Sequence, residues 1–526
     1  MPRANAPWGD ALNWSRPFDL LVLAIFATLR PFLAHRDALF AAGALASPAA
    51  QFAAALAAAW AALPLLAPAA RPWVALIVMI QPAFLAYALL GRPDHHALFG
   101  FALALAAGGF VRILAGPLGR GAAIAFGLLA ALPLWISVEF LVVWAAIAVA
   151  GALAWLLDPD GLPASRLRDH AVGLALGIAA VLVIERGPGF AASAYDKISI
   201  VHLTLAVLAA AGWAALGAMH RAGAARRAAA AGAIALAALA VETALFPRVL
   251  AGPAADVDAA VIAAHLGATL EMRPLWPTDA ATLRDFLFGN GWALLGIAGA
   301  LPRLAAGPRR AGFAPLLFVV LAAGSYAVLG CLHARFTMFA GLLAAPLVAD
   351  LLMRVRAGLA DALIGRAAAT ALLLLGPGLA GLGVAALAGR SSFEREVATV
   401  RGTCAVRDAL PALGRPPTVV IANLNFGPEL LWRTPHGVLG TPFHRNRDGI
   451  LDGVAFFAAV DDRAAQAIAA RRGAGLVLFC PSLDGATHVD PRALGRRLLA
   501  GEVPAWLAAL PEAGKGFHVY AIAGAP

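Results

Sequence analysis

Asp94-His95-His96 is a group whose residue types could hold a metal ion. An aspartate and a histidine two residues apart, here Asp94 and His96, can present one oxygen and one nitrogen to the same divalent cation. The alternative is structural: Asp94 caps a helix and both histidines lie in solvent. The residues alone favour the structural alternative.

A second acidic candidate, Glu271, lies in a loop of about 40 residues, 246–286, whereas the other loops are short. Long loops in compact proteins are often functional. The alternative is that Glu271 is a solvated surface acid, and the bare sequence favours that interpretation.

Arg335 begins another apolar run, with His333 two residues before it. A guanidinium can bind a phosphate through two parallel hydrogen bonds. An arginine that anchors a helix end at a membrane surface is an equal alternative. Smaller candidates are Glu139, Glu185 and the loop Tyr195-Asp196-Lys197.

Membrane helices are the elements that must position these side chains. The chain is 61% hydrophobic and 13% charged, whereas soluble domains are about 45–50% apolar and about 25% charged. Its apolar runs of about 16–24 residues have the length needed to cross a bilayer. The net charge of +10 falls largely in short loops between these runs, so no nucleic-acid partner is expected.

Twelve membrane spans are predicted from these runs. An earlier stretch, 19–34, is interrupted by Arg30 and Pro31 and predicts an interfacial or re-entrant helix. The twelve spans lie near 43–66, 72–90, 95–114, 121–136, 139–157, 170–185, 199–218, 228–245, 287–304, 314–331, 336–353 and 367–389.

The distribution of arginine predicts how the chain is oriented, because basic residues stay on the cytoplasmic side. The loops after the odd-numbered spans carry thirteen arginines, while the other loops carry fewer basic residues and several acids. We therefore expect a multi-pass protein of the bacterial inner membrane. The N-terminus, the loop 246–286 and the C-terminal domain would face the periplasm.

The composition changes after about residue 390. Short apolar runs at 418–422, 475–480 and 517–522 predict strands, and 460–472 predicts a helix, which indicates a small α/β domain. The expected domains are an outer N-terminal segment (1–42), a transmembrane domain (43–389) and a soluble periplasmic domain (390–526).

Cys404 and Cys480 both fall in this last domain, on the oxidising side of the membrane. A disulfide between them is possible, but two cysteines in one domain do not establish that they are close. The sequence leaves the question open.

In this order and on this side, the motifs resemble those of the oligosaccharyltransferase catalytic subunit and its bacterial and archaeal relatives. These are polytopic glycosyltransferases of the GT-C type. Asp94-His95-His96 is similar to the family's second acidic metal motif, and Thr269-Leu270-Glu271 with Arg273-Pro274 to its Thr/Ser-x-x-Glu motif. Arg335-Phe336-Thr337 resembles the stretch that carries the donor-pyrophosphate arginine, and the Trp14 segment resembles the one before the family's second span.

The resemblance implies a role for each of these residues. Asp94, His96 and Glu271 would ligate a divalent cation, Mg²⁺ or Mn²⁺, with Asp94 and Glu271 catalytic. Arg335 would bind the phosphate of a polyprenyl-linked sugar donor. The further candidates for substrate contacts are His333, Tyr195, Lys197, His444, Arg445 and Asn446.

The sequence departs from the family in two places. The family has a further span, followed directly by a first metal-binding Asp, before the segment that Trp14 resembles, and here Asp10 has no span before it. Either the true start lies upstream of Met1, or this version of the enzyme is incomplete at its N-terminus. The Trp-Trp-Asp-Tyr-Gly signature that grips the asparagine acceptor is replaced by Asn423-Leu424-Asn425-Phe426-Gly427. N-glycosylation is therefore not expected. The polar run around His444 could contact another acceptor, although ordinary loop chemistry is favoured there.

The expected fold is thus a polytopic α-helical, GT-C-like membrane protein of about twelve helices with a small C-terminal α/β domain. The expected function is transfer of a sugar or glycan from a polyprenyl-(pyro)phosphate donor to a cell-envelope acceptor at the outer membrane face. The alternative is a non-enzymatic transporter or assembly partner for lipid-linked glycans. A transporter needs a polar path, yet the predicted spans are nearly free of charge in their middles.

Overall fold

A computed structural model describes residues 1–10, 15–308, 310–359, 362–388, 404–485, 490–511 and 516–524. Trp14 and Arg309, which entered the sequence analysis, lie outside these residues. The chain forms two compact units. We call Trp14–Asp256 with Pro274–Ala388 the helical unit, and Met1–Asn13 with Val257–Arg273 and Gly389–Pro526 the α/β unit.

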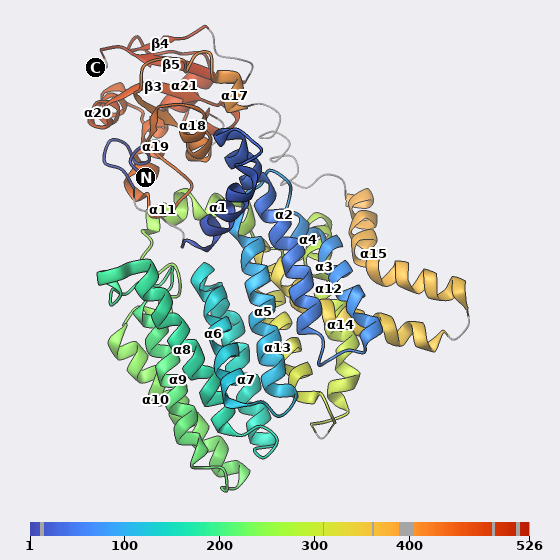
Figure 1. The fold of residues 1–526 in the computed structure, drawn as a ribbon. Coiled ribbons are helices and arrows are strands. Elements are labelled where there is room, and N and C mark those ends of the chain that lie inside the picture. The colour runs from blue at the N-terminus through green and yellow to red at the C-terminus, as the bar shows by residue number, and fades with distance from the viewer. Residues whose placement is uncertain are drawn as a thin grey trace. The chain divides into compact units, whose positions relative to one another are not determined.

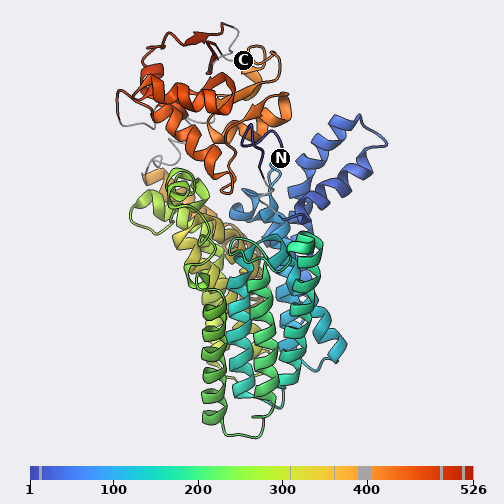
Figure 2. The same ribbon diagram turned by 90° about the vertical axis from the view of Figure 1, so that its left-hand side faces the viewer.

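The helical unit consists of long helices packed side by side (Figures 1 and 2). Its helices are α1 (Pro17–Leu29), α2 (His35–Ala61), α3 (Arg71–Ile80), α4 (Pro82–Leu85), α5 (His95–Ala115), α6 (Arg120–Ile136), α7 (Leu141–Leu157), α8 (Ala164–Arg186), α9 (Ile200–Gly217), α10 (Ala224–Leu245), α12 (Ala280–Ala305), α13 (Phe313–Leu332), α14 (Thr337–Gly358) and α15 (Leu363–Ala388). Short 3₁₀ turns, η2 (Val138–Phe140) and η7 (Ala334–Phe336), precede α7 and α14.

Nine helices in the described part of the chain are long and apolar enough to cross a membrane. Three shorter apolar helices, Pro17–Leu29, Pro68–Ile80 and Arg120–Ile136, accompany them. The chain is therefore a multi-pass membrane protein by the length and composition of its helices. Every predicted span overlaps a helix, and the count of about twelve crossings stays a prediction.

The predicted span 72–90 is wrong as a single helix. The helix α3 ends at Ile80, Gln81 has an extended backbone with ψ 119°, and α4 begins at Pro82. Proline has no N–H to donate and disfavours helical geometry at the residue before it. The apolar run therefore contains a break that hydropathy alone does not reveal.

The α/β unit is built on a sheet whose described strands lie in the order β2-β1-β3-β5-β4. β1 (Val419–Ala422) pairs in parallel with β2 (Gly437–Val438) and β3 (Ala474–Phe479). β5 (His518–Ile522) pairs antiparallel with β3 and β4 (Leu507–Ala509). The three predicted strands match β1, β3 and β5. The helices are α11 (Ala259–Ala264), α17 (Val406–Ala409), α18 (Gly427–Arg433), α19 (Arg447–Ala458), α20 (Asp462–Arg472) and α21 (Leu494–Leu499).

The N-terminal segment belongs to this α/β unit. Ala6 donates its backbone N–H to Val438 O at 3.0 Å, and Val438 donates to Arg3 O at 2.9 Å. The segment therefore pairs with the edge strand β2, whose backbone groups would otherwise lack partners. The fully buried Arg472 fixes it further by donating to Asn5 Oδ1 at 2.7 Å.

The middle of the long loop 246–286 also belongs to the α/β unit. Asp258, the N-cap of α11, accepts a hydrogen bond from Arg447 of α19 at 2.6 Å. His265 bonds to the backbone of Pro442. The sequence grouped this loop with the transmembrane domain, because contacts between residues so far apart along the chain leave no mark on hydropathy.

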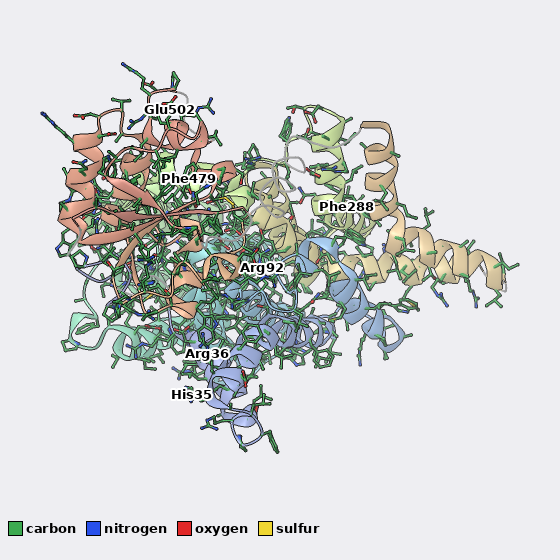
Figure 3. All side chains as sticks on the ribbon, turned by 90° about the horizontal axis from the view of Figure 1, so that it is seen from above. His35, Arg36, Arg92, Phe288, Phe479 and Glu502 are labelled. Carbon is green, nitrogen blue, oxygen red and sulfur yellow. A yellow bond between two sulfur atoms is a disulfide. The ribbon has the colours of Figure 1, made fainter. Side chains whose placement is uncertain are left out.

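A disulfide joins Cys404 to Cys480 and appears as a yellow bond in Figure 3. Cys480 directly follows β3. The bond therefore ties the start of the described α/β segment to the end of a central strand, and it answers the question that the sequence left open.

Asp484 is buried just beyond this disulfide. Burial raises the pKa of Asp484 to about 7, although hydrogen bonds from the Cys480 backbone and the Asn423 side chain act in the opposite direction. Asn423 follows β1 and Asp484 follows β3, so the two residues link the carboxyl ends of neighbouring parallel strands.

Replacing Asp484 by Asn will abolish the decrease in folding stability that ionisation of Asp484 causes as pH rises. The pKa of Asp484 is raised from an ordinary 3.8 to about 7, so the native state keeps a proton that the unfolded state releases between these values. Stability therefore falls as pH rises through this range and levels off above it. We expect the melting temperature of Asp484→Asn, relative to the native chain, to rise between pH 5 and pH 8, as measured in detergent. A difference that does not change with pH would contradict this account.

Candidate functional site

Asp94 stands at the start of α5 and caps it. Its Oδ1 accepts a hydrogen bond from the backbone N–H of His96 at 3.0 Å. The structural alternative for this motif is therefore correct as far as the cap is concerned. The same oxygen also lies 2.5 Å from His96 Nδ1, so the carboxylate does more than end the helix.

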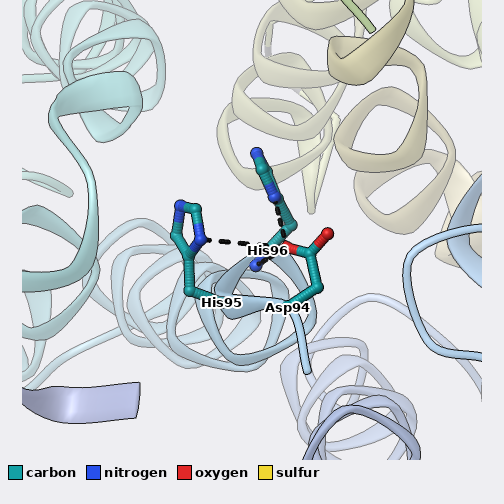
Figure 4. A group of neighbouring side chains, drawn as sticks. All are labelled: Asp94, His95 and His96. Carbon is teal, nitrogen blue, oxygen red and sulfur yellow. Dashed lines mark hydrogen bonds and ion pairs between the residues drawn. The ribbon is translucent and has the colours of Figure 1, made fainter. Parts of the chain in front are cut away.

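The two histidines are not in solvent, as that alternative required. Their side chains are 17% and 7% exposed, for His95 and His96 respectively. Their rings lie 4.3 Å apart, and Figure 4 shows both beside the Asp94 carboxylate. One ligand atom from each of the three residues falls within 4.8 Å of the others. Metal–ligand bonds of about 2.0–2.2 Å place neighbouring ligands roughly 3 Å apart, so the three residues are candidates for a cation site that would require small side-chain shifts on binding.

The Asp94 side chain carries a negative charge that can attract a cation. Burial by itself raises the pKa of Asp94, but the charges and hydrogen bonds of His96, with a smaller contribution from His95, outweigh burial and hold it below its usual range. Arg92 contributes a further contact, with Nη2 3.1 Å from Asp94 Oδ2. The carboxylate is therefore ionised at neutral pH.

Ser47 of α2 fixes the chain around Asp94. Its buried hydroxyl donates to Arg92 O at 2.7 Å and accepts from the backbone N–H of Asp94 at 2.8 Å. Two chain segments far apart in sequence thereby hold the approach to α5 in place. No local pattern around Ser47 indicates this role.

Aromatic contacts connect the histidines to α14. The His96 ring lies 5.0 Å from the Tyr87 ring and 6.3 Å from the Phe339 ring. Phe339 lies four residues after Arg335 and also packs against Tyr326 of α13 at 5.4 Å. The metal-binding candidates and the helix that follows Arg335 thus share one packed cluster.

Arg335 is held by a buried acid. Its Nη2 lies 2.5 Å from Oε1 of Glu139, whose side chain is 8% exposed. Arg335 itself is 24% exposed, and its charge interacts with His95. Tyr326 donates its hydroxyl to the backbone O of Glu139 at 2.9 Å. Arg335 is therefore fixed inside the protein, whereas an arginine that only anchors a helix end would point to solvent.

Three further predicted contacts, His333, Tyr195 and Lys197, also lie in the helical unit. His333 caps the end of α13, with its ring 6.1 Å from that of Phe336 beside Arg335. Tyr195 is buried beneath Arg248, whose guanidinium carbon lies 5.6 Å from its ring centroid. Lys197 lies half-buried in the same loop.

No protein-family model matches the sequence, and no similar sequence is found among curated proteins. Solved structures do match. The oligosaccharyltransferase AglB of Archaeoglobus fulgidus, in complex with an inhibitory peptide and a dolichol-phosphate, gives a TM-score of 0.68 at 15% identity over 98% of this chain and 67% of its own. The chain has the oligosaccharyltransferase fold. The enzyme from the same organism in complex with Zn and sulfate gives 0.62 at 16% identity, over 98% of this chain and 66% of its own. The form of this enzyme that is tethered to an acceptor peptide with the NVT sequon gives a TM-score of 0.68 at 16% identity. The match covers 99% of this chain and 67% of the archaeal chain.

This oligosaccharyltransferase fold confirms the resemblance expected from the motifs. The alignment spans nearly all of the present chain and about two thirds of the archaeal one. At such low identity it establishes the arrangement of the helices and the sheet, and the chemistry must be argued from the residues.

Four predicted site residues belong to the α/β unit. Glu271 lies half-buried in a short turn, Leu270–Met272, and its charge interacts with His265, which also interacts with His444. Its place in a metal site with Asp94 stays a prediction, as do the substrate contacts of His444 and Arg445.

Asn446 caps α19 by accepting from Gly449 N at 3.2 Å, and its amide donates to Leu439 O at 3.2 Å. These bonds match the alternative of ordinary loop chemistry.

Three residues of the cluster were missed or undervalued in the sequence. His95 was not proposed as a ligand, Glu139 was only a minor candidate, and Tyr326 was not singled out. Among these three, only Glu139 could be recognised from the sequence, because placing an ionisable acid at the start of an apolar run costs free energy and commonly marks a functional site.

Removing a ligand from the Asp94-His95-His96 cluster will weaken metal binding. We expect Asp94→Asn, His95→Ala and His96→Ala each to lower the Mn²⁺ affinity of the purified chain by about tenfold or more, measured by calorimetry after chelation. Glu185→Gln is the matched control, since Glu185 is occupied by Arg16 and Trp135. Equal affinity in all four variants and the native chain would exclude the cluster as a metal site.

Proposed function

We propose that the chain is a GT-C type membrane glycosyltransferase that moves a sugar or glycan from a polyprenyl-(pyro)phosphate donor to a cell-envelope acceptor. One observation carries the proposal. A carboxylate–imidazole cluster and a held arginine lie in one helical unit, and Phe339 and Tyr326 pack between them. Such a set suits a reaction in which a phosphate leaves.

The chemistry follows from where charge develops. Cleavage of a glycosyl–phosphate bond builds negative charge on the departing phosphate, and donors fixed in advance stabilise it. A divalent cation, when bound by Asp94, His95 and His96, would supply Lewis-acid stabilisation. Arg335 would hydrogen-bond the phosphate through its remaining N–H groups.

The choice of ligands bears on the cation. Mg²⁺ prefers oxygen ligands, whereas Mn²⁺ and Zn²⁺ accept imidazole readily. In the cluster two imidazoles accompany one carboxylate. Of the two cations expected from the sequence, Mn²⁺ is therefore the better match, and the related archaeal enzyme has been solved with Zn.

The polarity of the helices supports an anion at this site. The residues Asp94, Glu139 and Arg335 all lie at the starts of helices, namely α5, α7 and α14. The N-terminal ends of helices carry partial positive charge and favour anions. The arginine bias of the loops assigns this end to the periplasmic side of the bacterial inner membrane.

The acceptor contacts are proposed for the α/β unit. Glu271, His444 and Arg445 are the candidates there, and Tyr195 and Lys197 are the candidates for further donor contacts. The segment after β1 differs from the signature for asparagine acceptors, since Phe426 packs against Phe517 at 5.0 Å and Asn425 is exposed. We therefore propose an acceptor other than a glycosylation sequon.

Transfer assays on the full chain test this function. In detergent or liposomes, with a labelled polyprenyl-pyrophosphate glycan and Mn²⁺, we expect Asp94→Asn and Arg335→Gln to lower transfer or donor hydrolysis by about a hundredfold or more, because each removes charge stabilisation from the transition state.

Two outcomes would overturn the assignment. Activity that survives the double change Asp94→Ala and Glu271→Ala would exclude the proposed catalytic pair. Binding of the lipid-linked glycan that is independent of metal, with no turnover, would favour the transporter or assembly partner instead.

A further inference from the structure

The proposed reaction uses Arg335 but gives no role to the acid that holds it. Glu139 Oε1 lies 2.5 Å from Arg335 Nη2, and the Glu139 side chain is more than nine-tenths buried. Its other oxygen, Oε2, is also buried and has no hydrogen-bond partner among the described residues. A carboxylate in this setting depends on the guanidinium for its stability.

Glu139 is also rigidly placed. It lies in the short turn η2, where its backbone N–H donates to Ser137 Oγ at 3.3 Å. Its backbone carbonyl accepts the hydroxyl of Tyr326, which is fully buried. Glu139 is the fixed partner of the pair, and the more exposed Arg335 is the partner that a ligand can reach.

An incoming phosphate therefore cannot simply take the place of Glu139. Withdrawal of Arg335 would strand a buried carboxylate with no counter-charge, which is among the costliest changes in a protein interior. A guanidinium has five N–H donors arranged around a plane. One edge can stay with Glu139 while another binds a phosphate.

We infer that Glu139 is a positioning and specificity-determining residue that remains paired with Arg335 while the phosphate of the donor binds. The inference rests on the proposed function, since it assigns a partner to the proposed phosphate-binding arginine. Glu139 aims the guanidinium and balances its charge in advance. The Glu139 carboxylate beside the guanidinium repels the phosphate, so the anion is held less tightly than it would be without Glu139, and the lipid phosphate can leave after transfer.

The inference makes a prediction that a purely structural role does not make. Removing the negative charge from Glu139 while keeping its shape will strengthen phosphate binding, because a repulsive charge beside the anion is lost. We expect Glu139→Gln to bind inorganic pyrophosphate, and a short-chain polyprenyl pyrophosphate, about tenfold more tightly than the native chain. Calorimetry on the full chain in detergent measures this. In the transfer assay, KM for the donor should fall while kcat does not rise.

Matched variants separate the possible outcomes. Glu185→Gln makes the same charge change at an acid that bonds Trp135 and Arg16 instead, and it should leave affinity unchanged. Arg335→Gln should abolish most of the binding. If Arg335→Gln has no effect, the proposed phosphate role of Arg335 fails. If it abolishes binding but Glu139→Gln binds equally or more weakly, only the present inference fails.

A second variant keeps the inference testable if Glu139→Gln does not fold. Glu139→Asp retains the charge but shortens the side chain by one methylene, so it repels the phosphate as before and no longer aims Arg335. We expect it to bind pyrophosphate more weakly than the native chain, with KM for the donor raised. Unchanged affinity in this variant would show that Glu139 does not position Arg335.

Discussion

A charge buried in apolar surroundings must have a partner, and this constraint decides where the ionised side chains of the helical unit lie. Glu139 is the clearest case, because its carboxylate faces Arg335 from within a packed helix bundle. Asp94 follows the same rule, since its carboxylate contacts the Arg92 guanidinium, the His96 ring and the backbone N–H of His96. These ion pairs and hydrogen bonds are clustered in the candidate site. Elsewhere the described spans hold few charges.

The opposite ends of the helices obey the constraint in another way. There the arginines donate to carbonyl groups that helix ends leave without partners. Arg112 donates to Trp60 O at 2.8 Å, Arg166 to Gly116 O at 2.8 Å and Arg227 to Leu156 O at 2.8 Å. Two of these three, Arg166 and Arg227, are among the loop arginines that predicted the orientation of the chain, so these residues also tie its segments together. The two ends of the helical unit therefore differ in chemistry, with ion pairs such as Asp94–Arg92 and Glu139–Arg335 at one end and arginine–carbonyl hydrogen bonds at the other.

The fold and the site residues support different conclusions about function. Likeness to the archaeal oligosaccharyltransferase extends over nearly the whole chain at 15–16% identity, and such a fold can be shared by enzymes with different acceptors. The residues supply the chemical basis of the proposed function, because Asp94, His95 and His96 suit a cation and Arg335 suits an anion. In that proposal, the Glu139–Arg335 pair tunes how firmly the anion is held. The exposed Asn425 and the packed Phe426 stand in place of an aromatic signature, and they are the basis for proposing an acceptor other than a sequon.

The sequence by itself determined the membrane class, the α/β character of the last domain, and the types of residue available for chemistry. It did so because hydropathy and short motifs are local properties, readable without knowing what lies nearby. It could also propose Asp94, His96 and Arg335, but it did not show that His95 lies in the same cluster or that Glu139 pairs with Arg335. Only the tertiary structure decided that Glu139 of η2 faces Arg335 of η7, that Ser47 of α2 fixes Asp94, and that Cys404 is bonded to Cys480. These contacts join residues far apart along the chain, and their energies depend on burial and distance, which no local pattern of residues contains.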